Sequence, residues 1–420
     1  MLTKSKRVEI PYGKEFYELK LKREFDVIKR EESAPLVNPE EELLKQFNDP
    51  ISALPLKELV KGKKDIIIVV SDVTRPVPNK LILEALLPYL YECGFSNKNL
   101  SFIIANGSHY NPTDQEIIEI LGEDIKNNFK IYHNDCSIEE DFASVGYVEN
   151  GIEVKINKKY INADFKILTG LLNPHIYAGY SGGRKSIVPG LCNKDSWKLF
   201  HGVDLIGHSQ TMVDSLEHSP FHRIANAVMK KAGADFLINV ALTIDRKING
   251  IFCGDAQDAF FSGVCFMRQN YKIETPVKYD ISVTNGSGYP LDSYFYQLVK
   301  GMSTPIPYTK KGGEIICVAK CENGIGKGYF YDIYKKIKNL NEWRNNLEQR
   351  EYVMEQWTMQ AYHRLFSNMK VKLFSPLFKT EPELNNFIEE INNVEKYLNN
   401  KIDENPDINI GVFLDGPDFV

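Results

Sequence analysis

The first part of the chain alternates between short apolar runs and amphipathic segments. The apolar runs predict buried strands at residues 65–70, 100–105, 129–133, 165–169 and 235–243. Between and after them, apolar positions recur at helical spacing over residues 78–93, 113–121, 194–201 and 221–232. Strands that alternate with helices are typical of a mostly parallel sheet flanked by helices. The pattern therefore predicts an α/β fold.

The rest of the chain predicts a second α/β domain. Residues 1–60 favour a strand-rich start and a helix near residues 39–47. Beyond residue 275 we expect strands at 280–284, 314–319 and 409–414, and helices at 340–365 and 381–398. A chain of 420 residues is too long for one ordinary core. We expect an N-terminal domain over 1–272, a C-terminal domain over 275–405, and a final strand within 406–420 that is a candidate to return to the first domain.

Composition narrows the functional classes. The net charge of −5 gives no general electrostatic reason to bind nucleic acid. The longest apolar runs, 66–70 and 102–105, are far shorter than the roughly 20 residues of a membrane span. The N-terminus lacks the apolar segment of a secretory signal. Seven scattered cysteines, of which only Cys317 and Cys321 are close in sequence, favour reduced thiols. We expect a cytoplasmic protein that binds neither nucleic acid nor membrane.

Polar residues follow three of the predicted strands. Asp72 and Arg75 follow the strand at 65–70, His109 follows the next, and His175 follows the strand at 165–169. The carboxyl ends of parallel strands share one edge of a sheet, where ligands bind. Imidazoles titrate near neutrality and act as acid or base. Two histidines on opposite sides of one substrate carbon would suit inversion of a stereocentre.

Residues 173–201 carry the densest set of reactive groups. A glycine pair, Gly182 and Gly183, precedes Arg184 and Lys185, and His201 follows 16 residues after the lysine. Glycine permits backbone angles that let a chain approach a ligand closely. The segment lacks the spacing of a phosphate-binding P-loop, and the chain has no H-E-x-x-H.

Gln297 and Lys300 form a further candidate pair. They lie three residues apart on one helical face, after the glycine-rich turn NGSGYP. With Arg75, whose planar guanidinium matches a carboxylate, they would grip an acidic substrate. Simpler structural explanations also stand: a solvated helix face for this pair, an ion pair for Asp72 and Arg75, and local hydrogen bonding for each histidine.

Five blocks of the sequence together resemble one family. They are SDVTRP at 71–76, NGSHYNPT at 106–113, NPHIYAGYSGGRKSIVPG at 173–190, His201, and SGYPLDSYFYQLVKG at 287–301. This set is similar to the lactate racemase family that uses a nickel pincer nucleotide, from about residue 8 to the C-terminus. The resemblance implies two α/β domains with the active site in the cleft between them. It also implies a pyridinium-3-thioamide-5-thiocarboxylic acid mononucleotide that holds nickel through two sulfurs and a ring carbon.

The resemblance also assigns roles by motif. Lys185 would be the covalent tether of the cofactor, with Gly182, Gly183 and Arg184 beside it, and His201 would bind nickel. His109 and His175 would be the acid/base pair. The substrate-binding residues would be Arg75, Gln297 and Lys300 on the carboxylate, with Asp72, Tyr294 and Trp357. The implied reaction is racemisation or epimerisation of a 2-hydroxy acid by reversible hydride transfer, with separate maturation enzymes as partners that supply the cofactor.

Two departures from the family pattern bear on the substrate. His109 is followed by Tyr110 and Asn111, where the family often has Arg-Pro, and His175 is followed by Ile176 and Tyr177 rather than two aromatics. Tyrosine and asparagine can hydrogen-bond extra hydroxyls of a sugar acid or a second carboxylate. The expected substrate is lactate-like or a larger, more polar 2-hydroxy acid. The alternatives are a non-catalytic binder of the nickel nucleotide and an α/β metallohydrolase with zinc bound by His and Asp.

Overall fold

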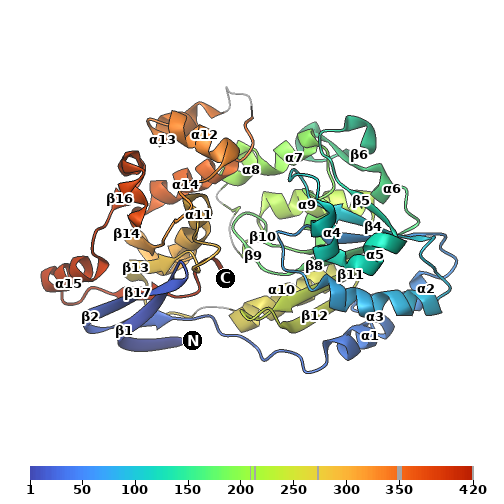
Figure 1. Ribbon diagram of the computed structural model, residues 1–420, viewed down its shortest axis with the longest axis horizontal. Coiled ribbons are helices and arrows are strands. Elements are labelled where there is room, and N and C mark those ends of the chain that lie inside the picture. The colour runs from blue at the N-terminus through green and yellow to red at the C-terminus, as the bar shows by residue number, and fades with distance from the viewer. Residues whose placement is uncertain (209, 212–213, 272–273, 348–351, 419–420) are drawn as a thin grey trace. The chain divides into compact units, whose positions relative to one another are not determined.

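The computed structural model describes residues 1–420 except 209, 212–213, 272–273, 348–351 and 419–420 (Figure 1). The chain divides into two compact units. One comprises Glu32–His201 and His208–Asn270, and we call it the six-stranded unit. The other comprises Met1–Glu31, Gly202–Gly207 and Tyr271–Val420, and we call it the seven-stranded unit.

The six-stranded unit has the parallel architecture that its sequence pattern predicts. Its sheet has the order β12-β11-β8-β3-β4-β5, and only β12 runs antiparallel to its neighbour. The strands are β3 (Ile66–Ser71), β4 (Leu100–Ala105), β5 (Lys130–His133), β8 (Phe165–Leu171), β11 (Phe236–Leu242) and β12 (Ile248–Gly254). Two smaller antiparallel pairs are formed by β6 (Phe142–Tyr147) with β7 (Glu153–Asn157) and by β9 (Pro174–His175) with β10 (Gly179–Tyr180).

Helices accompany these strands. They are α1 (Pro39–Asn48), α2 (Leu56–Leu59), α3 (Asn79–Glu92), α4 (Asp114–Leu121), α5 (Glu123–Asn128), α6 (Lys158–Ile161), α7 (Lys194–His201), α9 (Pro220–Ala232) and α10 (Asp258–Tyr271). Every residue of β3 from Ile66 to Val70 is buried. A strand of a parallel sheet has both faces covered, so a continuous apolar run, rather than alternation, marks it in the sequence.

The seven-stranded unit contains both ends of the chain. Its sheet has the order β1-β2-β17-β13-β14-β15-β16, and only β1 and β2 pair antiparallel. The strands are β1 (Leu2–Tyr12), β2 (Glu15–Ile28), β13 (Tyr279–Asn285), β14 (Thr309–Val318), β15 (Lys370–Phe374), β16 (Glu389–Glu390) and β17 (Ile410–Phe413). The helices are α8 (Val203–Gly207), α11 (Phe295–Ser303), α12 (Gly328–Lys336), α13 (Leu340–Asn345), α14 (Gln356–Asn368) and α15 (Val394–Glu404).

The two ends of the chain meet in this sheet. We expected residues 1–272 to form one domain, whereas the structure places β1 and β2 with the C-terminal elements. The final strand β17 lies between β2 and β13, with Gly411 opposite Asp26. Pairing between strands so far apart in sequence leaves no trace in local periodicity, which is why the pattern of apolar residues did not reveal it.

Two predicted helices differ from the structure. The segment 381–398 is a 3₁₀ turn at Pro382–Asn386, then β16, and the helix α15 begins only at Val394. Asn393 caps α15 by accepting a hydrogen bond from the Lys396 amide, which fixes that start. The predicted helix 340–365 is divided into α13 and α14, and residues 348–351 lie outside the described part. Among the described residues, no helix is both long and apolar enough to cross a membrane.

Candidate active site

Three neighbouring strands of the six-stranded unit bring polar residues to one edge of the sheet. Strand β3 lies between β8 and β4, and all three run parallel. Asp72 directly follows β3, His109 lies four residues beyond β4, and His175 lies in β9, just after β8. The strand order therefore produces the common rim that the sequence led us to expect.

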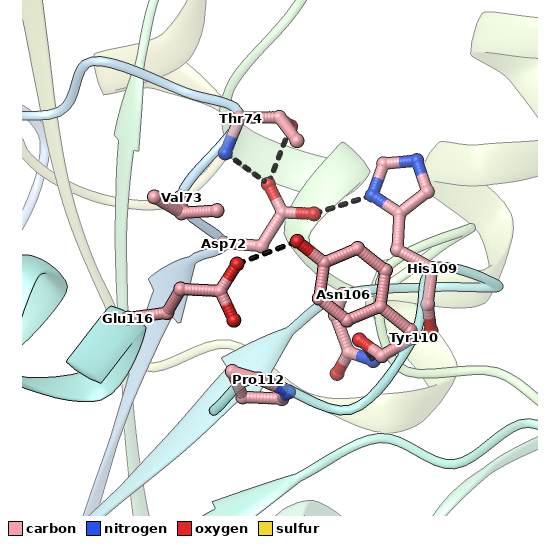
Figure 2. A pocket seen from close by; sticks show the side chains of 8 residues that line it. All are labelled: Asp72, Val73, Thr74, Asn106, His109, Tyr110, Pro112 and Glu116. Carbon is pink, nitrogen blue, oxygen red and sulfur yellow. Dashed lines mark hydrogen bonds and ion pairs between the residues drawn. The ribbon is translucent and has the colours of Figure 1, made fainter. Parts of the chain in front are cut away.

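Asp72 and His109 form a direct hydrogen-bonded pair (Figure 2). His109 Nδ1 lies 2.5 Å from Asp72 Oδ2, and Thr74 donates to Asp72 Oδ1 through its hydroxyl at 2.6 Å and its amide at 3.2 Å. Burial by itself would raise the pKa of the Asp72 carboxyl. The hydrogen bonds from His109 and Thr74, with the nearby charge of Arg75, outweigh burial and hold this pKa below its usual value.

An ionised Asp72 determines which nitrogen of His109 carries a proton. A carboxylate only accepts hydrogen bonds, so Nδ1 must be the donor. In the neutral ring this leaves the lone pair on Nε2. Figure 2 shows Nε2 directed away from Asp72, while the ring of Tyr110 and the Glu116 carboxylate lie on the other side. The arrangement presents His109 as a base whose carboxylate partner would stabilise the protonated ring.

A small pocket adjoins this pair. It has a volume of about 20 Å³ and is lined by Asp72, Thr74, Tyr110 and Glu116 among others. The Tyr110 hydroxyl donates to Glu116 at 2.5 Å. This space is enough for about one water molecule and not for a substrate.

In His175 the other ring nitrogen carries the proton. Its Nδ1 accepts hydrogen bonds from the backbone amides of Tyr177 and Ala178, each at 3.2 Å. An Nδ1 that accepts two N–H groups cannot carry a proton in the neutral ring, so the proton lies on Nε2. The two predicted acid/base residues thus present a lone pair at one Nε2 and an N–H at the other.

The loop that carries Lys185 is fixed from within the sheet. Gly182 and Gly183 have φ values of +77° and +51°, which side chains other than glycine rarely adopt. Asn239, fully buried on β11, accepts a hydrogen bond from the Gly183 amide at 3.1 Å and donates to the Gly170 carbonyl at 3.2 Å. Lys185 follows in a short 3₁₀ turn, Gly183–Ser186, and is half-buried.

His201 is held at the end of α7. Its Nδ1 lies 3.1 Å from the Trp197 carbonyl oxygen, and its ring stacks on the Trp197 ring with centroids 3.9 Å apart. Because a carbonyl only accepts, Nδ1 carries the proton and Nε2 the lone pair. The dense packing around the ring lowers the pKa of His201 to about 3; the bond to Trp197 opposes this, and the charges of Lys185 and His109 add to it. Lys185, His109 and His201 therefore lie close to one another.

The seven-stranded unit holds the other predicted substrate residues. Lys300 Nζ donates to Gln297 Oε1 at 3.0 Å on one face of α11, and Tyr294 occupies the N-cap position of that helix. Trp357, at the start of α14, contacts Tyr296 edge to face with centroids 6.1 Å apart. The helices that carry these four residues, α11 and α14, pack together.

Comparisons with known proteins cover both units. The lactate racemase N-terminal domain matches residues 12–213, and the lactate racemase C-terminal domain matches residues 274–418. The chain is 34% identical over 371 residues to a lactate racemase from Thermoanaerobacterium thermosaccharolyticum, covering 87% of each chain. This chain belongs to the lactate racemase family.

Further members of the lactate racemase family support the match. A lactate racemase from Lactiplantibacillus plantarum is 31% identical over 371 residues, covering 88% of this chain and 85% of the relative. The solved structure of the lactate racemase apoprotein from T. thermosaccharolyticum superposes with a TM-score of 0.87 at 31% identity and covers 99% of both chains. The fold and its two domains are therefore those of the lactate racemase family.

The described residues fit the cofactor that resemblance to the lactate racemase family implies. That cofactor needs one protein ligand on nickel and one lysine amine. His201 is neutral above about pH 3 and carries its lone pair on Nε2, the form in which imidazole binds metals. Within the described part of the chain, no group of three or more His, Cys, Asp and Glu is placed to hold a metal.

Some contributors to the site were not predicted. Thr74 orients Asp72, Trp197 orients His201, and Asn239 fixes the glycine turn. Trp197 lies four residues before His201 on a predicted helix, so helical spacing could have revealed it. Asn239 lies in an apolar strand far along the chain, and no local pattern links it to Gly183. Arg184, predicted beside the cofactor, is buried with its guanidinium over the ring of Phe260.

Proposed function

We propose that this protein is an isomerase that inverts the C2 stereocentre of a 2-hydroxy acid with a nickel pincer nucleotide attached to Lys185. The observation that carries the proposal is the opposite polarity of His109 and His175. One ring presents a lone pair at Nε2 and the other presents an N–H. Membership of the lactate racemase family supports the reaction class.

The two histidines would handle the hydroxyl proton. When bound, the nickel pincer nucleotide supplies a reversible hydride acceptor. His109 Nε2 would take the hydroxyl proton of the substrate while the α-hydrogen would pass to the bound nucleotide, leaving a planar 2-keto acid. Asp72 would stabilise the imidazolium that forms. His109 would return this proton to the oxygen when the α-hydrogen is delivered to the opposite face, and the Nε2–H of the neutral His175 would donate a hydrogen bond to the same oxygen.

Cationic and amide side chains would hold the substrate carboxylate. Arg75, on the exposed turn after Asp72, offers a planar pair of donors, and Lys300 and Gln297 offer further donors from α11. Holding the carboxylate fixes the C2 carbon relative to both histidines, which is how positioning lowers the barrier. The substrate would be lactate-like or a larger, more polar 2-hydroxy acid; the Tyr110 hydroxyl and the Asn111 amide already bond to Glu116 and Asp135.

The test uses a substrate deuterated at C2. We expect the loaded protein to invert it with deuterium retained, because hydride does not exchange with water. We expect His109→Ala and His175→Ala each to lower kcat by about 100-fold or more. His133→Ala is the matched control, since this histidine ends the neighbouring strand β5.

Three outcomes would contradict the proposal. Washout of deuterium into water would indicate abstraction of the α-hydrogen as a proton. Suppose that the protein is fully loaded with the nickel nucleotide and that His109→Ala and His175→Ala both function like the wild type. This result would favour a non-catalytic binder instead. Zinc in place of nickel, with an unmodified Lys185, would favour the metallohydrolase.

A further inference from the structure

Next to the lysine loop lies a buried cation, Arg184, for which the described residues supply no counter-ion. Arg184 is 1% exposed, and its guanidinium lies 4.3 Å from the centroid of the Phe260 ring. Its Nη2 donates to the Ala178 carbonyl at 2.6 Å. Its Nε and Nη1 are buried and have no hydrogen-bond partner within the part of the chain that the structure describes. A buried N–H without an acceptor destabilises the folded protein, and more so when the group is charged.

His222 adds a third N–H to this cluster. Its Nε2 faces the Asn226 amide nitrogen at 2.8 Å, so Nε2 accepts and the ring proton lies on Nδ1. This Nδ1 is also buried, and none of the described residues accepts a hydrogen bond from it. The His222 ring stacks on Phe260 with centroids 6.1 Å apart. Arg184 and His222 are thus gathered around one aromatic side chain, close enough for the arginine charge to affect the histidine.

The acidic side chains of this region are already engaged. Asp214 and Glu217 both pair with Arg268, at 2.6 and 2.9 Å, and Tyr180 donates to Asp214 at 2.9 Å. Burial alone lowers the pKa of Arg184 to about 9, so the guanidinium remains charged at neutral pH. Water could accept one of the three N–H groups but would leave the charge uncompensated. An anion would accept these hydrogen bonds and also compensate the charge of the guanidinium.

We propose that Arg184 and His222 form a buried site for a small anion that accepts hydrogen bonds from Arg184 Nε and Nη1 and from His222 Nδ1. Two sources share this chemistry: a free inorganic anion, and the phosphate of a pyridinium mononucleotide. The site is a property of the unmodified protein. Its test therefore does not depend on the isomerase reaction proposed above.

The test measures thermal stability of the unmodified protein in sodium methanesulfonate at constant ionic strength. Sodium chloride, sodium phosphate or nicotinic acid mononucleotide then replaces part of the methanesulfonate. We expect a saturable rise in Tm with at least one of them. We expect Arg184→Met to abolish this rise, and His222→Phe to weaken the apparent affinity by about 10-fold. Arg223→Met is the control, because this exposed arginine lies on the same helix and pairs with Glu149.

The three added salts distinguish a free inorganic anion from the phosphate of a nucleotide. A response to chloride or phosphate identifies a free anion, whereas a response confined to the nucleotide identifies its phosphate. The absence of any anion-specific rise in the wild type would overturn the inference, as would an unchanged rise in Arg184→Met. If Arg184→Met does not fold, the test rests on His222→Phe. An anion affinity equal to that of the wild type in this variant would also overturn the inference.

Discussion

The chemistry of this site depends on which ring nitrogen of each histidine carries the proton. Asp72 assigns the proton of His109 to Nδ1, whereas two backbone amides assign that of His175 to Nε2. Neither assignment needs a substrate, because both come from neighbours within the same unit. The proposed function therefore has one base and one hydrogen-bond donor in place before substrate binds, which suits a reaction that removes and returns a proton on one oxygen.

Replacing Asp72 by asparagine tests this organisation. An amide in place of the carboxylate can donate to Nδ1, which moves the proton to Nε2 and removes the base. We expect Asp72→Asn to lower kcat by about 100- to 1000-fold without loss of the fold. Initial rates of racemisation on loaded protein are the measurement. Asp114→Asn, which removes an exposed carboxylate paired with Lys126, should leave kcat near the wild-type value. Equal rates for the two variants would show that Asp72 does not orient His109.

Sequence reasoning located some of these residues and missed others. The rule that parallel strands end on one edge was enough to bring Asp72 and His109 together, because both directly follow apolar runs. The protonation of the rings depends on single hydrogen bonds, and Asn239 acts across the sheet, so neither is visible in a local pattern.

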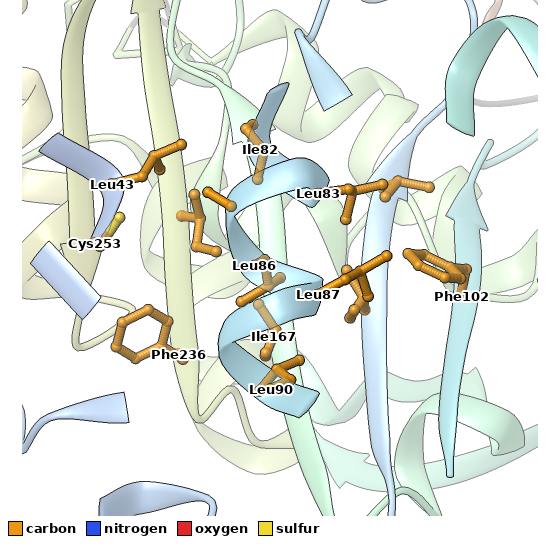
Figure 3. Close-up of a cluster of buried hydrophobic side chains, with 14 of the residues drawn as sticks. Leu43, Ile82, Leu83, Leu86, Leu87, Leu90, Phe102, Ile167, Phe236 and Cys253 are labelled. Atoms are coloured by element: carbon orange, nitrogen blue, oxygen red, sulfur yellow. The ribbon is translucent and has the colours of Figure 1, made fainter. Parts of the chain in front are cut away.

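At the scale of elements, apolar runs and helical spacing were reliable where burial was complete. Helix α3 buries Ile82, Leu83, Leu86, Leu87 and Leu90, and Figure 3 shows Leu86 and Leu87 in the cluster that also contains Phe102 and Ile167. The prediction of one helix over 381–398 was wrong because the apolar residues of this segment are shared between a 3₁₀ turn, a short strand and a helix. Each piece is too short for its periodicity to be distinguished from one long helix.

The glycine turn before Lys185 gives a prediction about stability. A Cβ at position 182 would lie 2.6 Å from Asn239 Oδ1, at a φ of +77°. Gly62 has almost the same φ, +76°, but no atom within 4 Å of its would-be Cβ. We expect Gly62→Ala to cost about 1 kcal/mol and Gly182→Ala at least about 2 kcal/mol, because only the second also disturbs a buried hydrogen bond. Urea unfolding measures both, and equal costs would mean that Asn239 does not constrain the turn.

At the scale of the whole molecule, the first strands belong with the last. Strands β1 and β2 complete the sheet of the seven-stranded unit through β17, so truncation at either end of the chain would expose that core. Composition and length correctly indicated two α/β domains. They could not indicate which domain the N-terminus joins, because this depends on strand pairing between the two ends of the sequence.

Acid stability should reflect the buried histidines. Burial, with the nearby charge of Arg184, lowers the pKa of His222 from 6.5 to about 3 in the folded protein. Between these pH values the unfolded chain binds a proton that the folded chain does not, so stability falls as pH decreases below 6.5. We expect His222→Phe to show a shallower loss of unfolding free energy between pH 7 and pH 5, in a buffer of fixed salt. The same pH slope in both proteins would contradict a neutral buried His222.

The most direct test of the central claim is the intact mass and nickel content of protein produced together with a cofactor-making system. We predict added mass localised to Lys185 and a nickel ion on each chain, both lost in Lys185→Ala and retained in a control, Lys194→Ala, at the exposed start of α7. Unmodified, nickel-free protein from a host that loads another lactate racemase would contradict the account.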